Sequence, residues 1–158
     1  MGAERFRPLH ISRSGVVAVD LPFDETLELF TPEGERLGVP GWRPEYLFRA
    51  GGGDEIDTVF RTDHDGEETL WIVLDHDRED GTVSYSRLTP GSRLGTVAIS
   101  VEPIDERSCW VEVCYELTGL SEAGNAALAA LSTRAFKAML EEWETRIAAR
   151  TATSVARS

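Results

Sequence analysis

The residues best suited to chemistry are two tyrosines and an arginine in predicted strands. Tyr85 and Arg87 occupy alternate positions of one segment, so a strand would turn both side chains to the same face. Tyr115 lies in a second alternating segment. A buried hydroxyl or guanidinium needs a hydrogen-bond partner. That partner is either a protein group, such as Asp75 or Glu102, or a carboxylate, carbonyl or phenolate of a bound molecule.

Two Asp-His-Asp triplets, residues 63–65 and 75–77, invite a metal-binding interpretation, since histidine and carboxylates are suitable ligands. The triplets flank a single predicted strand. At ~3.3 Å per residue, a strand of this length separates them by more than about 30 Å. They cannot share one ion, and we interpret each as a solvated hairpin end. We therefore expect no metal site and no cofactor.

Nucleophilic catalysis has little support in the sequence. It contains no Gly-x-Ser-x-Gly motif, and His10 lies in the N-terminal arm. Cys109 and Cys114 lie in one predicted strand on opposite faces, too far apart to form a disulfide. We expect one buried and one partly exposed thiol, and no residue is assigned as catalytic.

The charge and hydropathy of the chain exclude several classes of partner. The formal net charge is −12, and no cluster of Lys and Arg is present. Nucleic acids and anionic membrane surfaces are therefore not expected as partners. The longest uninterrupted apolar run, residues 70–74, is far shorter than the ~20 residues of a membrane span. The first residues lack the apolar segment of a secretory signal, so we expect a cytoplasmic protein without membrane insertion.

The longest periodic segment runs from Ser121 to about Ala149 and predicts a single amphipathic helix. Ser121 is its expected N-cap, with Asn125 as the alternative. The residues beyond it, 151–158, are expected to form a flexible tail. The apolar stripe of the helix is about 140° wide at 100° per residue and comprises Leu128, Ser132, Ala135, Phe136, Met139, Leu140, Trp143 and Ile147.

The chain before this helix is predicted to form strands, with two short helices between the first strand and the second. Helices are predicted at residues 22–30 and 33–37, followed by a turn that Trp42 would anchor to the core. The Asp65-Gly66 turn places Phe60 opposite Trp71. The apolar faces of the last two strands coincide only if residues 103–107 hold a bulge or an odd-length loop. Strands are predicted at residues 11–20, 46–49, 57–62, 67–75, 82–88, 93–103 and 109–117.

This order of elements, together with residues 31–42, 68–73 and 120–128, resembles the START-like (SRPBCC) superfamily. Its members include pollen-allergen-type proteins, polyketide cyclases/dehydrases and lipid-transfer proteins. The resemblance implies an α+β helix-grip fold, in which a curved antiparallel sheet of about seven strands and two short helices wrap around a long C-terminal helix. It implies one domain over residues 1–150. The superfamily has no single catalytic motif, so the resemblance assigns no catalytic residue.

The resemblance also implies a cavity between the sheet and the helix. The inward-facing positions would either fill this space as a packed core or stand back from it and bind a ligand. They are Phe60, Trp71, Val73, Tyr85, Arg87, Val97, Ile99, Val111, Val113, Tyr115, Phe136, Met139 and Trp143.

Three functions are compatible with this prediction. The first is binding of a small hydrophobic or amphipathic molecule, lipid-like or polyketide-like, in the cavity. The second is an enzyme of the cyclase/dehydratase kind, in which Tyr85, Arg87 or Tyr115 donates hydrogen bonds to a developing enolate. The third is a protein-interaction module with a filled core, resembling the chaperone-activator branch. The sequence gives no oligomeric state.

Overall fold

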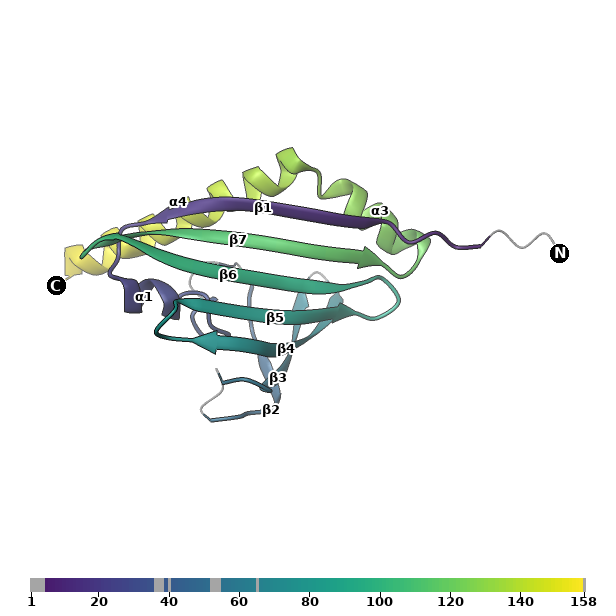
Figure 1. The fold of residues 1–158 in the computed structure, drawn as a ribbon, viewed down its shortest axis with the longest axis horizontal. Helices are drawn as coiled ribbons and strands as arrows, with labels where there is room; N and C mark the ends of the chain where they lie inside the picture. The colour runs from purple at the N-terminus through teal and green to yellow at the C-terminus, as the bar shows by residue number, and fades with distance from the viewer. Residues whose placement is uncertain (1–4, 36–38, 40, 52–54, 65, 158) are drawn as a thin grey trace.

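A single antiparallel sheet organises the chain (Figure 1). The computed structural model describes residues 5–35, 39, 41–51, 55–64 and 66–157, with side chains as far as Thr151. Over these residues the sheet has seven strands in the order β1-β7-β6-β5-β4-β3-β2. The strands are β1 (His10–Val19), β2 (Glu45–Phe48), β3 (Val59–His64), β4 (Glu67–Asp77), β5 (Thr82–Thr89), β6 (Arg93–Asp105) and β7 (Ser108–Gly119).

Helices cover one side of this sheet. They are α1 (Phe23–Glu28), α3 (Glu122–Ala130) and α4 (Thr133–Arg157). In Figure 1, α3 and α4 run along the edge formed by β1 and β7, and α1 lies near the ends of the central strands. The second predicted short helix falls partly on residues 36–38, outside the described residues, as does most of the glycine-rich stretch after Ala50.

Two features of the sheet register that the sequence predicted are confirmed. Phe60 pairs with Trp71, as the Asp65-Gly66 turn required. The irregularity expected near residues 103–107 is a register shift between Pro103 and Asp105. It brings the apolar faces of β6 and β7 together, so that Val97 lies opposite Tyr115. These paired faces form the floor of the interior.

The prediction of a single C-terminal helix is wrong, because the helical conformation is interrupted at Leu131 and Ser132. Leu131 leaves the helical conformation at φ −86° and ψ 62°. The Ser132 hydroxyl then accepts a hydrogen bond from the Ala135 N–H at 3.1 Å, which caps a new helix. The break allows α3 to pack on β7 and α4 to pack on β1. The Ser121 cap is confirmed, because its side chain accepts from the Gly124 N–H. The backbone of α4 continues to Arg157, through the predicted tail.

Helix α4 approaches the sheet over a glycine. A Cβ atom at Gly15 of β1 would lie 2.5 Å from Leu140 Cδ1 and 3.7 Å from a ring carbon of Phe136. Phe136 and Leu140 are both buried. The missing side chain therefore lets this end of α4 close directly on β1 and form a packed core there.

One prediction about the Asp-His-Asp triplets is wrong. Strand β4 continues to Asp77, and His76 is only 8% exposed. The turn begins at Asp77, whose Oδ1 accepts from the N–H groups of Glu79 and Asp80 at 2.9 Å each. His76 is thus a buried strand residue. In the other triplet, His64 ends β3 and is exposed, while Asp65 lies outside the described residues.

The cysteines and the surface agree with the composition. Cys109 is buried and Cys114 partly exposed, and both are free, as predicted.

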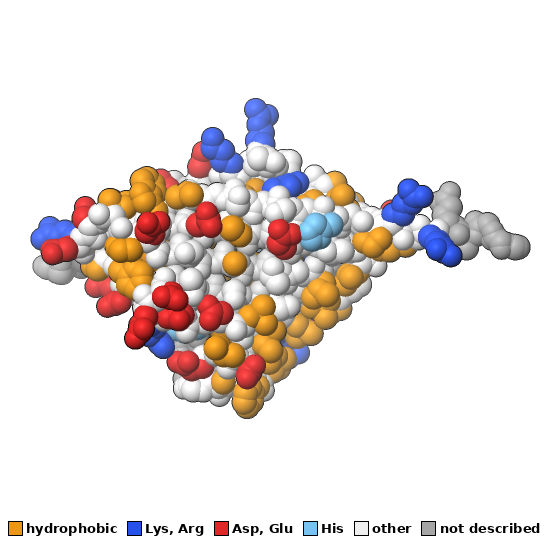
Figure 2. Space-filling view, in the orientation of Figure 1, with side chains coloured by type: hydrophobic (Ala, Val, Ile, Leu, Met, Phe, Trp, Pro, Cys, Tyr) orange, Lys and Arg blue, Asp and Glu red, His pale blue; other side chains and the backbone are white. Residues whose placement is uncertain are grey.

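Acidic side chains are scattered among hydrophobic ones on the face shown in Figure 2, and basic side chains stand mainly toward its ends and edges. Among the described residues, no helix combines the length and hydropathy needed to cross a membrane.

Candidate functional site

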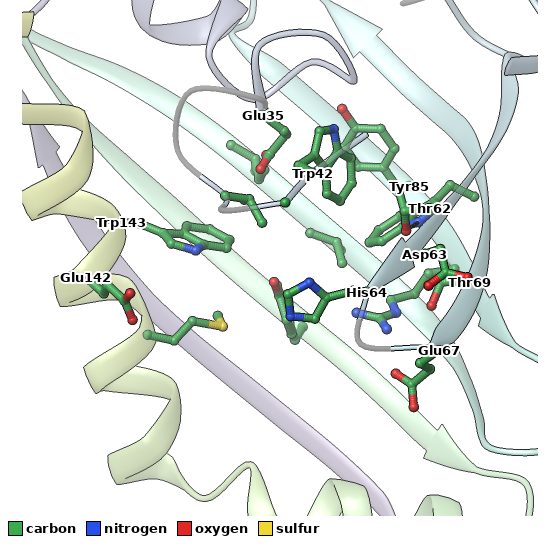
Figure 3. Close-up of a pocket in the computed structure, with 18 of the residues that line it drawn as sticks. Glu35, Trp42, Thr62, Asp63, His64, Glu67, Thr69, Tyr85, Glu142 and Trp143 are labelled. Carbon is green, nitrogen blue, oxygen red and sulfur yellow. Dashed lines mark hydrogen bonds between the residues drawn. The ribbon is translucent and has the colours of Figure 1, made fainter. Parts of the chain in front are cut away.

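A cavity of about 430 Å³ lies between the sheet and α4 (Figure 3). The sheet supplies its floor, α4 supplies one wall, and the segment around Glu35 and Trp42 supplies another. The lining residues are Glu35, Val39, Gly41, Trp42, Thr62, Asp63, His64, Glu67, Thr69, Trp71, Tyr85, Arg87, Arg93, Val97, Ile99, Tyr115, Met139, Glu142, Trp143 and Arg146.

An aromatic cluster forms the wall beside β3 and β4. The rings of Trp42 and Trp71 meet edge to face, with centroids 5.3 Å apart, and Phe60 stacks on Trp71 at 5.9 Å. Each indole N–H has a protein acceptor: Trp42 Nε1 donates to the Pro32 carbonyl at 2.7 Å, and Trp71 Nε1 donates to the Thr62 hydroxyl at 3.0 Å. The prediction that Trp42 anchors its turn to the core is confirmed. These indoles therefore present fixed apolar faces to the cavity.

Tyr85 contributes its ring to the lining and holds a loop with its hydroxyl. The hydroxyl donates a hydrogen bond to the carbonyl of Phe30, beyond the end of α1. Its proton is thus engaged within the protein. This corrects the hypothesis that Tyr85 donates to a bound enolate.

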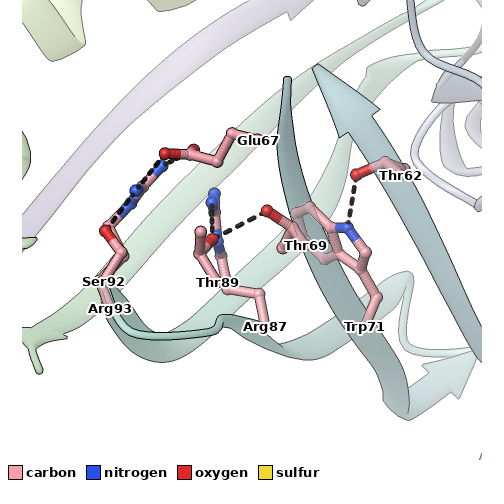
Figure 4. A network of polar contacts seen from close by, with 8 residues as sticks. All are labelled: Thr62, Glu67, Thr69, Trp71, Arg87, Thr89, Ser92 and Arg93. Atoms are coloured by element: carbon pink, nitrogen blue, oxygen red, sulfur yellow. Dashed lines mark hydrogen bonds and ion pairs between the residues drawn. The ribbon is translucent and has the colours of Figure 1, made fainter. Parts of the chain in front are cut away.

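Arg87 lies beside Tyr85 on β5 and also faces the cavity, as their alternate spacing predicted. Its guanidinium carbon lies 4.9 Å from the ring centroid of Trp71, a cation–π distance. Nη2 reaches the Thr89 hydroxyl only at 3.5 Å, and that hydroxyl also bonds Thr69 at 2.8 Å (Figure 4). Nε is buried and has no hydrogen-bond partner among the described residues. Desolvation lowers the pKa of this guanidinium. Arg87 is therefore a half-buried cation with unused donor capacity.

Glu35 places a second ionisable group in the cavity, and the sequence interpretation did not identify it. Its side chain is buried, and Figure 3 shows the carboxyl directed toward the interior near Trp42. Burial raises the pKa of Glu35 to about 8, so the carboxyl is mostly protonated at neutral pH. A protonated carboxyl can both donate and accept a hydrogen bond.

Tyr115 on β7 is electrostatically coupled to both of these groups. Burial raises the pKa of its hydroxyl, the charge of Arg87 lowers it, and the charge of Glu35 raises it. The ring stacks edge to face on Phe136 at 5.0 Å. Glu35, Tyr115 and Arg87 thus form a polar set within an otherwise aromatic and aliphatic chamber.

The mouth of the cavity carries paired charges. Arg93 forms a salt bridge with Glu67 at 2.6 Å, and Arg146 forms one with Glu142 at 2.7 Å. His64 lies at the same opening (Figure 3). Both mouth arginines are therefore neutralised locally, unlike Arg87.

The structure divides the thirteen predicted lining residues into two groups. Eight face the cavity: Trp71, Tyr85, Arg87, Val97, Ile99, Tyr115, Met139 and Trp143. The other five lie in the hydrophobic core around it: Phe60, Val73, Val111, Val113 and Phe136. Alternation gives the correct face for the strand residues of both groups, and helical periodicity gives it for Phe136, Met139 and Trp143. Neither pattern shows how far each strand position lies from α4.

Comparison with known proteins identifies the fold. No protein-family model matches the chain, and no curated protein does. Solved structures do match. Norcoclaurine synthase from Thalictrum flavum aligns at a TM-score of 0.62 and 16% identity, over 87% of this chain and 86% of that one. The ZhuI aromatase/cyclase from Streptomyces sp. R1128 aligns at 0.62 and 16%, over 92% and 96%. Major latex-like protein 151 from Panax ginseng aligns at 0.65 and 15%, over 90% and 97%. At these identities the likeness shows the fold alone. The chain therefore has the helix-grip fold that these solved structures share.

Proposed function

We propose that the protein binds a small, largely apolar molecule in the cavity between the sheet and α4. The observation that carries this proposal is the open space of about 430 Å³ beneath an aromatic wall. It falls within the range of about 300–1,000 Å³ typical of small-molecule sites. If α4 packed on the whole sheet as it packs over Gly15, the space would be filled. The cavity also counts against the interaction-module hypothesis, which requires a filled interior.

The polar groups of the cavity support an amphipathic ligand. A few polar groups in an apolar lining fix the orientation of a bound molecule. Here they are the Glu35 carboxyl, the Tyr115 hydroxyl and the Arg87 guanidinium. One solved structure of norcoclaurine synthase is a complex with dopamine and hydroxybenzaldehyde, so a protein with this fold can bind small aromatic molecules.

Native mass spectrometry of freshly purified protein tests the proposal. We expect a co-purifying small molecule on the wild type and its loss from Met139→Trp, because the larger side chain would occupy the cavity. Ala138→Trp is the matched control, because Ala138 is exposed on the same turn of α4. A ligand retained by Met139→Trp and lost from Ala138→Trp would place the binding site elsewhere.

Enzymatic enolisation is the second candidate, and Glu35 is the observation that favours it. A base with a pKa near the working pH is well matched to proton transfer. The Glu35 carboxylate would take a proton from a carbon beside a carbonyl. The C–H electron pair would move toward the carbonyl oxygen, which Tyr115 and Arg87 would stabilise.

Turnover of the molecule found by mass spectrometry tests this alternative. We expect Glu35→Gln to lower kcat at least about 100-fold, in the range of general acid–base catalysis. Arg87→Ala is expected to lower kcat by removing the stabilising cation. Unchanged kcat in both variants would exclude the alternative and leave binding as the function.

A further inference from the structure

The interior of the cavity holds a positive charge, that of Arg87, which no described carboxylate contacts directly; Glu67 at the mouth acts on it only at longer range. The lining contains three arginines. Arg93 and Arg146 are each held in a salt bridge at the mouth. Within the part of the chain that the structure describes, Arg87 is in no salt bridge and its Nε has no hydrogen-bond acceptor. A partly desolvated cation without a carboxylate in contact is unfavourable, and a bound anion would relieve that cost through charge-assisted hydrogen bonds.

The acid inside the cavity does not neutralise Arg87 at neutral pH. Because burial raises the pKa of Glu35 to about 8, its carboxyl is mostly uncharged below that pH. The charges of Arg87 and Glu35 both affect the pKa of Tyr115, so its hydroxyl lies within electrostatic range of each. The other charged or titratable groups facing this space belong to the mouth: Asp63 and His64 of β3, Glu67 of β4, Arg93 of β6, and Glu142 and Arg146 of α4. The inner chamber therefore carries a net positive charge that ionisation of Glu35 would cancel.

We propose that the cavity selects a singly charged organic anion with a flat apolar body, held by Arg87 and released when Glu35 ionises. This inference rests on the proposed binding function and adds the charge of the ligand and its control by pH. The carboxylate, phenolate or enolate oxygen of the ligand accepts from the guanidinium N–H groups of Arg87 that line the cavity. The apolar body lies against the indoles of Trp42 and Trp143, which face the same space.

Two isosteric probes test the charge preference. 2-Naphthoate is an anion from pH 6 to 9, and 2-naphthamide is neutral and of the same shape. Calorimetric titration of the full chain at pH 6.5 is expected to show naphthoate binding at least about tenfold tighter, from one charged hydrogen bond. Arg87→Met is expected to weaken naphthoate about 10-fold to 100-fold and to change naphthamide less than about threefold. Arg87→Lys keeps the charge and should keep most of the preference.

The same titrations at pH 9 test the role of Glu35. Naphthoate is expected to bind the wild type about tenfold more weakly than at pH 6.5, because the Glu35 carboxylate then repels it. Glu35→Gln should remove this dependence. Glu106→Gln should retain it, because Glu106 lies in an exposed turn and does not line the cavity.

The results of these titrations distinguish a failure of the proposed anion preference from a failure of the proposed binding function. Equal binding of both probes, unchanged in Arg87→Met, would refute the anion preference while the binding function stands. A pH dependence that survives Glu35→Gln would refute the control by Glu35. Failure of the wild type to bind either probe would overturn the proposed function together with this inference. Naphthamide binding by Arg87→Met serves as its check of folding.

Discussion

Replacing Phe136 with alanine is expected to lower the free energy of unfolding by about 3 to 5 kcal/mol, the usual cost of truncating a buried phenylalanine. Phe136 is 2% exposed and lies where α4 closes on β1. Its ring meets Tyr115 edge to face at 5.0 Å and lies beside Gly15. Truncation leaves a void between helix and sheet that the rigid strands cannot fill by moving inward. Urea denaturation followed by circular dichroism measures the loss.

Lys137→Ala provides the matched control for this prediction. Lys137 is the next residue of α4 and is exposed, so its truncation is expected to change stability by less than about 0.5 kcal/mol. A loss below about 1 kcal/mol for Phe136→Ala would contradict the packed contact between α4 and β1. The comparison also tests the division of the helix stripe, because Phe136 belongs to the core whereas Met139 faces the cavity.

The strand arrangement could be predicted from sequence because its signals are local. Alternation determines which face of β6 and β7 is buried, and the short turns require antiparallel neighbours. The bulge at Pro103 followed from the conflict between two apolar faces. The break at Ser132 was missed because its side chain lies on the predicted apolar stripe at helical spacing, and a serine within a helix resembles a serine that caps one.

The site was only partly predictable because its shape depends on distances between layers. Periodicity assigned Tyr85 and Arg87 to the same face, and both line the cavity. It could not show that the Tyr85 hydroxyl would bond to the Phe30 carbonyl, which is 55 residues away in the chain. Glu35 had no signal in the sequence, since an acid after Thr31-Pro32 in a short polar segment normally faces solvent. Its burial depends on how that segment packs over the sheet.

Glu35→Gln is expected to stabilise the protein at alkaline pH. The pKa of Glu35 is raised from 4.5 to about 8 because burial disfavours the carboxylate. The native state therefore holds this proton more tightly than the unfolded chain does. The stability linked to it is fully present below pH 4.5 and is lost as pH rises through about 8. At about 1.4 kcal/mol per pKa unit, the loss reaches at most about 5 kcal/mol. Glutamine cannot ionise, so the variant should retain this stability.

Guanidinium denaturation at pH 5, 7 and 9 measures this difference. We expect the variant and the wild type to differ by less than about 1 kcal/mol at pH 5, with the advantage of the variant growing toward pH 9. Glu106→Gln, at an exposed turn, controls for the loss of one negative charge from an acidic protein and should show no such trend. Parallel stability curves for Glu35→Gln and the wild type would mean that Glu35 is solvated. The chamber would then lose the acid that sets its charge, and release of an anion at high pH would have no physical basis.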